Sequence, residues 1–344
     1  MSRKRRIVGV DLIKVLACFS VIMLHVSMPF FYSDGAFKVG NTIVLSKTVY
    51  YLGTSAVPLF FMANGFFLVN RAKMSINYVL NKIGLIMIPI LGWNLIVFIP
   101  KTILKKNENG YFETVLGSLM QKGFFFQFWF LGALIIMLFL VPILNKIMKS
   151  SIKLYVIVLI IFLIISWLID LYNHFSGAIP LQKNVIQTFR VWTWISYYMS
   201  GGLIGNLIKK INFIDFKKQL NYFSVVLTVL TIIYSIHNAV WISNPFAEYN
   251  YDNILIFIWI VTIFLTCIST TKFSKHSTKI IESISKYSFG IYIVHVIVLK
   301  IFEKIFVFDG IFINLITIIG VFLISWLITF VISKIPYVNK LVIF

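Results

Sequence analysis

Ten apolar runs, each long enough to cross a lipid bilayer, constrain this chain more than any other feature of its sequence. A helix needs about 20 apolar residues to cross roughly 30 Å of hydrocarbon. Runs of this kind occupy residues 8–30, 48–69, 83–100, 124–144, 154–170, 191–208, 220–241, 253–270, 287–307 and 311–332. Because backbone groups in lipid must be paired within the chain, we expect an all-α bundle of about ten transmembrane helices. We predict one transmembrane domain over residues 1–344, with no separate soluble domain.

The overall composition agrees with a polytopic membrane protein. Hydrophobic residues make up 60% of the chain and charged residues only 12%, and the mean hydropathy is +0.94. A soluble domain is nearer half apolar and one quarter charged, so these values exclude a soluble enzyme, a disordered chain and a nucleic-acid-binding domain. The two cysteines, Cys18 and Cys267, both lie in apolar runs, and we expect neither a disulfide framework nor a metal site.

The positive charge follows the expected topology. The chain has 31 Lys and Arg against 11 Asp and Glu, a formal net charge of +20. With the N-terminus inside, 20 of the basic residues fall in inner segments and 8 in outer segments, while Lys14, Lys300 and Lys304 lie within runs. Cytoplasmic loops collect Lys and Arg, so we expect both termini in the cytoplasm. A basic cytoplasmic face would also suit anionic lipid or a phosphorylated cofactor.

The first run holds three ionisable residues, Asp11, Lys14 and His25. Ionisable residues within a membrane are costly and therefore indicate function by default. At about 100° per residue all three fall on one stripe of a helix, with Asp11 roughly 21 Å from His25. Asp11 can pair with Lys14, three residues further on. From this helix alone, function and packing explain the stripe equally well.

Other polar residues inside the runs have both functional and structural explanations. His25 and His295 lie deep in their runs, and histidine exchanges protons near neutral pH, which makes it a natural general base. For His295 we favour a structural hydrogen bond over a second polar group in the same cavity. Asn64 would bind a substrate or lock two helices, and we favour locking. The small-residue pair Gly201 and Gly205 indicates close helix packing.

The outer segments and the motif search leave the function open. The run Ala247–Asn253, AEYNYDN, is rich in hydrogen-bonding groups that would line a sugar site, although its tyrosines also fit an interfacial aromatic belt. The sequence holds no Walker loop, dinucleotide fingerprint, nucleophile elbow or zinc motif at a plausible place, which argues against ATP-driven, nicotinamide-dependent and metalloenzyme chemistry. Composition and spacing alone do not choose between an enzyme and a transporter.

Five motifs, in order along the chain, resemble those of one family. They are GVDLIKVLACFSVIMLH (Gly9–His25), PLFFMANGFFL (Pro58–Leu68), QFWFLGALI (Gln127–Ile135), FRVWTWISYYMSGGLIG (Phe189–Gly205) and SFGIYIVHVIVL (Ser288–Leu299). Together they resemble the membrane acyltransferase-three family, integral-membrane O-acyltransferases that modify surface polysaccharides. The sequence departs from the family pattern at four places: Lys14 stands where arginine is usual, Asn64 replaces serine, Gln127 replaces a frequent histidine, and Lys82 stands alone where an Arg-x-x-Arg element is common.

The resemblance implies transmembrane acyl transfer, with no bound cofactor and with cytoplasmic acetyl-CoA or another acyl-CoA as co-substrate. His25 would take the proton from an acceptor hydroxyl, either for direct attack on the thioester or within an acyl-histidine relay. The residues assigned to acyl-donor binding are Asp11, Lys14, Arg71 and Lys82. Those assigned to the cavity or the acceptor side are Asn64, Trp129, Arg190, Tyr249, Tyr251 and His295.

The leading hypothesis is an O-acyltransferase, and the alternatives are a transporter or flippase of a glycan intermediate and a structural assembly subunit. The expected partners are an acyl-CoA, a surface glycan or lipid-linked saccharide, and the bilayer, but no nucleic acid. Capsule, exopolysaccharide, teichoic acid and peptidoglycan all remain open as acceptors, and so does the choice between acetyl and succinyl donors. A Lys-, Ile- and Asn-rich composition suggests an AT-rich bacterial genome, so we expect a multi-pass protein of the bacterial plasma membrane.

Overall fold

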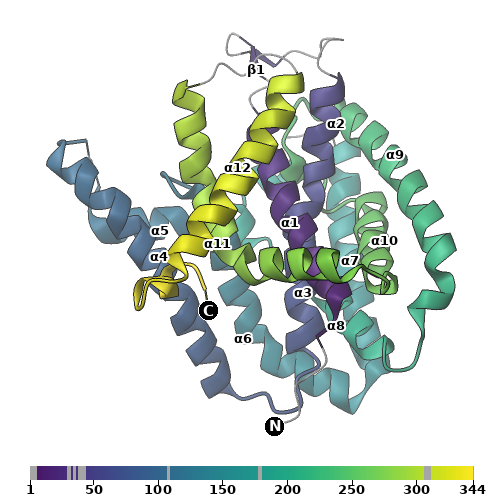
Figure 1. The fold of residues 1–344 in the computed structure, drawn as a ribbon. Coiled ribbons are helices and arrows are strands. Elements are labelled where there is room, and N and C mark those ends of the chain that lie inside the picture. The colour runs from purple at the N-terminus through teal and green to yellow at the C-terminus, as the bar shows by residue number, and fades with distance from the viewer. Residues whose placement is uncertain are drawn as a thin grey trace.

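The computed structural model describes residues 6–28, 32–33, 36–37, 44–106, 109–176, 180–305 and 311–343, which form a helical bundle (Figure 1). Two-residue strands β1 (Tyr32–Ser33) and β2 (Ala36–Phe37) pair antiparallel. The α-helices are α1 (Val8–Ser27), α2 (Val44–Leu52), α3 (Ala56–Leu68), α4 (Ile76–Ile103), α5 (Tyr111–Leu119), α6 (Trp129–Ser150), α7 (Ile152–Phe175), α8 (Val191–Leu207), α9 (Lys217–Trp241), α10 (Ile254–Ser269), α11 (Lys275–Ile305) and α12 (Ile311–Ile332). The 3-10 helices are η3 (Gly53–Ser55), η4 (Phe126–Phe128), η5 (Leu181–Lys183), η6 (Gln187–Phe189), η7 (Phe213–Phe216), η8 (Ala247–Tyr249) and η9 (Val338–Leu341).

Seven helical segments in the described part of the chain are long and apolar enough to cross a membrane. They are Val8–Ser27, Ser46–Leu68, Ile76–Ile103, Phe126–Ser150, Ile152–Phe175, Phe213–Trp241 and Ile311–Ile332. Helix α10 is apolar but has only 16 residues, and α8 has 17. Each of the ten predicted runs overlaps a helical segment, so the all-helical membrane architecture is confirmed. The count of ten spans and the side on which the termini lie stay predictions.

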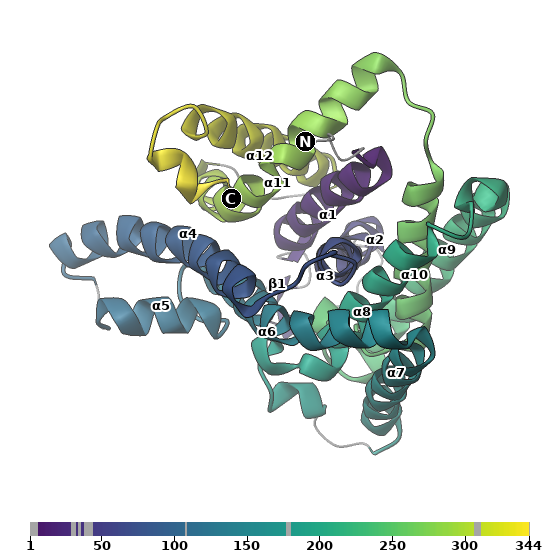
Figure 2. The ribbon, with the colours of Figure 1, turned by 90° about the horizontal axis from the view of Figure 1, so that it is seen from below.

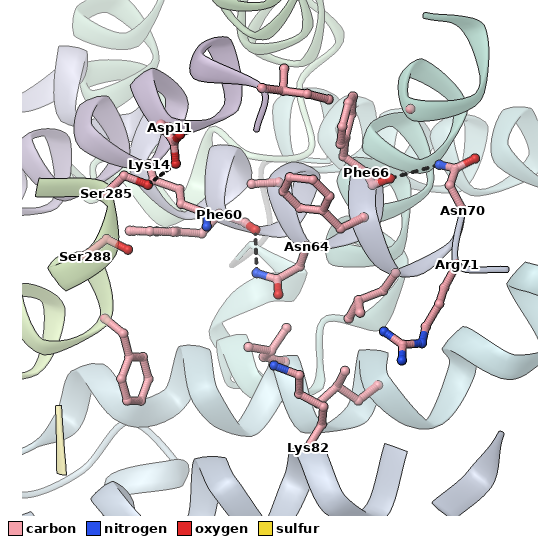
Figure 3. A pocket seen from close by; sticks show the side chains of 18 of the residues that line it. Asp11, Lys14, Phe60, Asn64, Phe66, Asn70, Arg71, Lys82, Ser285 and Ser288 are labelled. Carbon is pink, nitrogen blue, oxygen red and sulfur yellow. Dashed lines mark hydrogen bonds between the residues drawn. The ribbon is translucent and has the colours of Figure 1, made fainter. Parts of the chain in front are cut away.

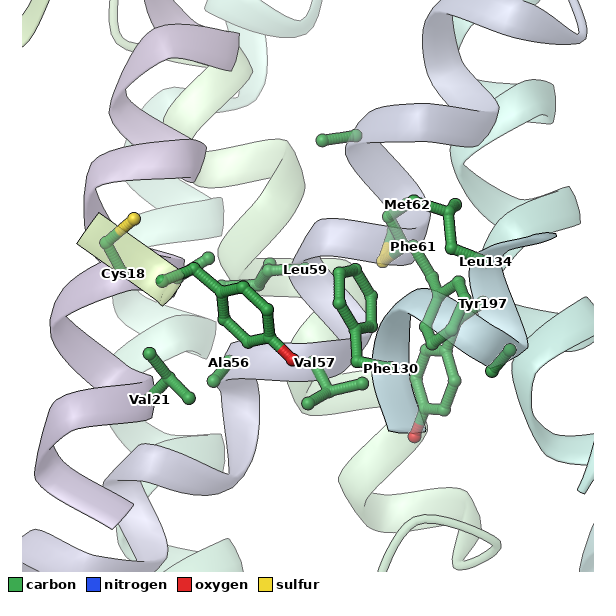
Figure 4. Close-up of a cluster of buried hydrophobic side chains, with 14 of the residues drawn as sticks. Cys18, Val21, Ala56, Val57, Leu59, Phe61, Met62, Phe130, Leu134 and Tyr197 are labelled. Atoms are coloured by element: carbon green, nitrogen blue, oxygen red, sulfur yellow. The ribbon is translucent and has the colours of Figure 1, made fainter. Parts of the chain in front are cut away.

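Helix α1 lies inside the bundle rather than at its rim. Figure 2 shows α1, α2 and α3 surrounded by α11 and α12, by α6 and α8, and by α9 and α10. Cys18 and Val21 of α1 pack toward Ala56 and Leu59 of α3 in a buried apolar cluster (Figure 4). Because protein encloses α1, its polar stripe faces other helices instead of lipid tails.

The closest helix contact in the bundle joins α3 and α8 through glycines. A Cβ added at Gly65 would collide with the backbone of Tyr198, and one added at Gly201 would collide with the backbone of Met62. Small residues let helix backbones approach at this distance, which in a membrane is a main source of helix association. The packing role predicted for Gly201 and Gly205 is therefore confirmed, since a Cβ at Gly205 would lie 2.6 Å from the carbonyl oxygen of Phe66.

Two asparagine amides, one buried and one partly buried, fix the chain where α3 ends. Asn70 donates from Nδ2 to the carbonyl oxygen of Gly202 on α8 at 2.8 Å. Asn145 of α6 donates from Nδ2 to the carbonyl oxygens of Val69 at 2.7 Å and Arg71 at 2.9 Å. These bonds tie three helices together at one end of the bundle and hold the backbone of Arg71 in place.

We predict that Gly201→Ala destabilises the protein, whereas Gly84→Ala does not. The methyl group at position 201 has no room beside the Met62 backbone, and overpacking of this kind costs about 1–3 kcal/mol. A Cβ at Gly84 on α4 meets no atom within 4 Å, so that variant is the matched control. Thermal unfolding of the two purified variants in the same detergent measures the difference. Equal stability of the two variants would contradict the assigned role of the α3–α8 contact.

Candidate active site

A cavity of about 930 Å³ lies among α1, α3, α4, α6, α8 and α11. The cavity lies at the end of the bundle where α1 begins, next to Arg6, and Figure 3 shows the interior of the cavity. Six of the described lining residues are cationic, and one, Asp11, is a carboxylate. The cations are Arg6, Lys14, Arg71, Lys82, Lys209 and Lys286. The cavity therefore favours an anionic ligand with several negative charges.

The single carboxylate is already neutralised by its neighbours. Arg6 Nε donates to Asp11 Oδ2 at 2.6 Å, and Arg6 Nη2 donates to Oδ1 at 3.2 Å. Ser285 Oγ on α11 donates to Asp11 Oδ1 at 2.5 Å. The hydrogen bond to Asp11 raises the pKa of Arg6, which lies just before α1. The structure thus pairs Asp11 with Arg6 instead of Lys14, because the arginine fork reaches back along the first turn and binds both carboxylate oxygens.

The remaining predicted cations share the same space. Figure 3 shows Lys14, Arg71 and Lys82 around the interior of the cavity, although they come from three separate parts of the chain. Lys14 has no ion-pair partner among the described residues, and its Nζ lies 5.9 Å from the ring centroid of Phe67. The guanidinium of Arg71 lies over the ring of Tyr78, with Cζ 3.8 Å from the ring centroid. The structure therefore brings together the whole set of residues that the sequence assigned to the acyl donor.

Asn64 also lines the cavity, but it does not lock two helices as we expected. Its Nδ2 donates to the carbonyl oxygen of Phe60 at 2.9 Å, within its own helix. Asn70 and Asn145 form the locking bonds instead. Neither residue stands out in the sequence, because each lies just past the end of an apolar run, where an asparagine is unremarkable.

The two deep histidines meet beyond the cavity. His25 lies 11 residues after Lys14 on α1, or about 16 Å along the helix axis. Its ring centroid is 5.2 Å from that of His295, with 35° between the ring planes, and 5.4 Å from that of Phe126. His295 is fully buried, and its Nδ1 lies 3.3 Å from the carbonyl oxygen of Ile291. The structure therefore gives His295 the backbone hydrogen bond that we favoured, and it places the ring beside His25 rather than in the lining of the cavity.

An aromatic group separates the cavity from the histidine pair. Tyr292 lines the cavity, and its ring centroid lies 5.9 Å from that of His295. The ring centroid of Tyr292 lies 5.4 Å from that of Phe130 and 6.3 Å from that of Phe60. Both phenylalanines also line the cavity. The Tyr292 hydroxyl donates to the main-chain carbonyl of Gln127. The path from the basic cavity to His25 thus passes Tyr292 and His295, which lie three residues apart on α11.

Four residues assigned to the cavity or the acceptor side lie elsewhere. Trp129 does not line the cavity but packs in the core against Trp194, with ring centroids 5.3 Å apart. Tyr249 and Tyr251 are both buried, and Tyr251 packs edge-on against Trp194 at 5.2 Å. Arg190 is only 3% exposed. The sequence placed Arg190, Tyr249 and Tyr251 in outer segments, and the structure shows all three buried, because these segments fold into the protein.

Arg190 holds these loops together. Its Nη2 lies 2.9 Å from Glu248 Oε2 and donates to the carbonyl oxygen of Gln182 at 2.6 Å, while its Nε donates to that of Val185 at 2.8 Å. Nearby, Asp252 accepts hydrogen bonds from Gln182 and Thr193, and burial raises the pKa of this carboxyl. The region around Ala247–Asn253 is therefore a buried polar network rather than an open sugar site.

Comparison with known proteins places the chain in a family. A family model for an acyltransferase domain matches residues 7–333. The chain therefore belongs to this acyltransferase family, the one that its five motifs resemble. An amino-acid racemase of Enterococcus faecalis is 27% identical over 212 residues, which make up 58% of this chain and 27% of the racemase. No solved structure matches the chain.

We predict that Arg190→Ala lowers the free energy of unfolding by about 3 kcal/mol, because it leaves buried acceptors and a carboxylate without their partner. Lys300→Ala removes an exposed ion pair with Glu303 and serves as the control, with an expected effect below about 1 kcal/mol. Thermal unfolding in one detergent measures both variants. A negligible effect of Arg190→Ala would show that this network does not hold the loops.

Proposed function

We propose that this membrane acyltransferase is an O-acetyltransferase that moves an acetyl group from cytoplasmic acetyl-CoA to a hydroxyl of a cell-surface or lipid-linked glycan. The observation that carries the proposal is the arrangement along α1. A cavity rich in cations surrounds Lys14, and a histidine pair at His25 lies further along the same helix. The proposal places both termini in the cytoplasm of a bacterium and the chain in its plasma membrane, in agreement with the distribution of Lys and Arg.

The basic cavity suits the phosphates of a coenzyme A thioester. Arg71 offers the planar fork that binds phosphate at two points, and it is stacked on Tyr78. Lys14 and Lys82 offer point charges from α1 and α4. The adjoining walls are apolar, with Phe60, Leu131 and Leu134 among them, and suit the uncharged pantetheine arm. Acetyl-CoA would bind as a co-substrate, and the proposal requires no resident cofactor.

His25 is the proposed general base. A neutral imidazole there accepts the proton of the acceptor hydroxyl while the oxygen attacks the thioester carbon, and a positioned base of this kind contributes about 10²–10⁴-fold to the rate. His25 is partly exposed, whereas His295 is fully buried, so His25 is the histidine that an acceptor can reach. The named activity of the racemase does not enter the proposal, because the similarity covers 27% of that protein.

We expect His25→Ala to lower acetyl transfer at least 100-fold while leaving the amount of folded protein unchanged. Membranes with matched expression receive radiolabelled acetyl-CoA, and label is counted in the glycan fraction. His276→Ala, an exposed histidine on the first part of α11, is the control and should retain full activity. Equal label from His25→Ala and wild type would remove His25 from the mechanism. No label from wild type with acetyl-CoA or succinyl-CoA, over a range of glycan acceptors, would favour a transporter.

A second prediction tests the donor end of the cavity. Lys14→Gln and Arg71→Gln should each raise the KM for acetyl-CoA about 10-fold, because each removes one charge-assisted contact worth about 1.5–3 kcal/mol. The value of kcat should change much less, since these contacts are the same before and during the reaction. Lys279→Gln is the control, because this exposed lysine does not line the cavity. Unchanged KM in both variants would contradict donor binding in this cavity.

A further inference from the structure

The second histidine, His295, has one ring nitrogen that the fold leaves unused. Its Nδ1 lies 3.3 Å from the carbonyl oxygen of Ile291, four residues earlier on α11. A carbonyl cannot donate, so the proton of the neutral imidazole is on Nδ1 and Nε2 is a bare acceptor. Nε2 is buried and has no hydrogen-bond partner among the described residues. A buried acceptor without a partner destabilises the fold, and such groups in native proteins call for an explanation.

The position of His295 in the bundle offers an explanation for its unpaired nitrogen. Its ring centroid lies 5.2 Å from that of His25 and 5.9 Å from that of Tyr292. Tyr292 lines the basic cavity, whereas His25 does not. His295 is therefore adjacent both to the proposed base and to a residue that lines the space proposed for the acyl donor.

We propose that His295 is a positioning residue for His25 that holds the reaction's proton between attack on the thioester and departure of the thiol, an inference that rests on the proposed function. The acceptor O–H bond breaks, and its proton passes to a ring nitrogen of His25 as the oxygen bonds to the acyl carbon. Collapse of the tetrahedral intermediate breaks the C–S bond and leaves the electron pair on sulfur. While the intermediate lasts, Nε2 of His295 holds the proton that His25 has taken up, and the proton returns through His25 to the thiolate. Nδ1 of His295 keeps its bond to Ile291 throughout, and both rings end neutral.

A purely structural role would not need an imidazole. The hydrogen bond from a side chain to the carbonyl four residues earlier is made elsewhere in this chain by asparagine. Asn64 donates to Phe60 at 2.9 Å, and Asn94 donates to Ile90 at 2.8 Å. An asparagine at position 295 would keep that bond and lack only the second nitrogen. His295→Asn therefore separates the two roles.

The test measures steady-state acetyl transfer by wild type, His295→Asn, His25→Ala and the double variant, all purified and matched for thermal unfolding midpoint. We expect His295→Asn to lower kcat about 100-fold with the KM for acetyl-CoA changed less than about twofold. The double variant should be no slower than His25→Ala alone, because residues that act as a unit do not lose activity independently.

Activity of His295→Asn within about twofold of wild type would overturn the inference and leave the Ile291 bond as the whole role of His295. A double variant slowed by the product of the two single effects would also overturn it. If His295→Asn has a lower thermal unfolding midpoint than wild type, His295→Gln provides the same comparison. The glutamine amide would lie near the position of Nε2 and cannot accept and release the proton. Failure of the proposed function shows instead as a wild type that transfers no acetyl group.

Discussion

The cost of an ionisable side chain inside a membrane determines where α1 lies. Asp11, Lys14 and His25 on one stripe could not face lipid without a large loss of free energy. The bundle meets this constraint by enclosing α1 between α3, α10, α11 and α12. The same enclosure forms the basic cavity at one end of the helix and the histidine pair toward the other. The site is thus a direct consequence of how the polar stripe is kept from lipid.

Close backbone packing makes this enclosure possible. Gly65 and Gly201 bring α3 and α8 together without intervening side chains, and Asn70 and Asn145 then bind the end of α3 to its neighbours. Within lipid these contacts must supply the association that burial of apolar surface supplies in water. They also place Arg71 at the edge of the cavity. The glycines of the second and fourth motifs therefore shape the site without lining its catalytic end.

The sequence predicted the groups of the site better than their contacts. Helical periodicity placed Lys14 and His25 on one stripe of a helix, and the family resemblance then assigned them, together with Arg71 and Lys82, to the site. The approach of His295 to His25 depends on how α11 packs on α1, which no local pattern records. The burial of Arg190 was missed for a similar reason. Polar loop residues show no periodicity, so a sequence cannot distinguish a solvated loop from one folded into a polar network.

The pairing of Asp11 with Arg6 has a consequence for the reaction cycle. With the one carboxylate among its described lining residues neutralised, the cavity presents fixed positive charge whether it is empty or filled. On the proposed function, the phosphates of the donor are the same before and after acyl transfer, so this charge does not distinguish acetyl-CoA from free coenzyme A. Selection between them falls to the aromatic end near Tyr292, where the acyl group is present or absent. The enzyme would then work as an exchanger of two near-identical anions, whose turnover follows the ratio of acylated to free coenzyme in the cell.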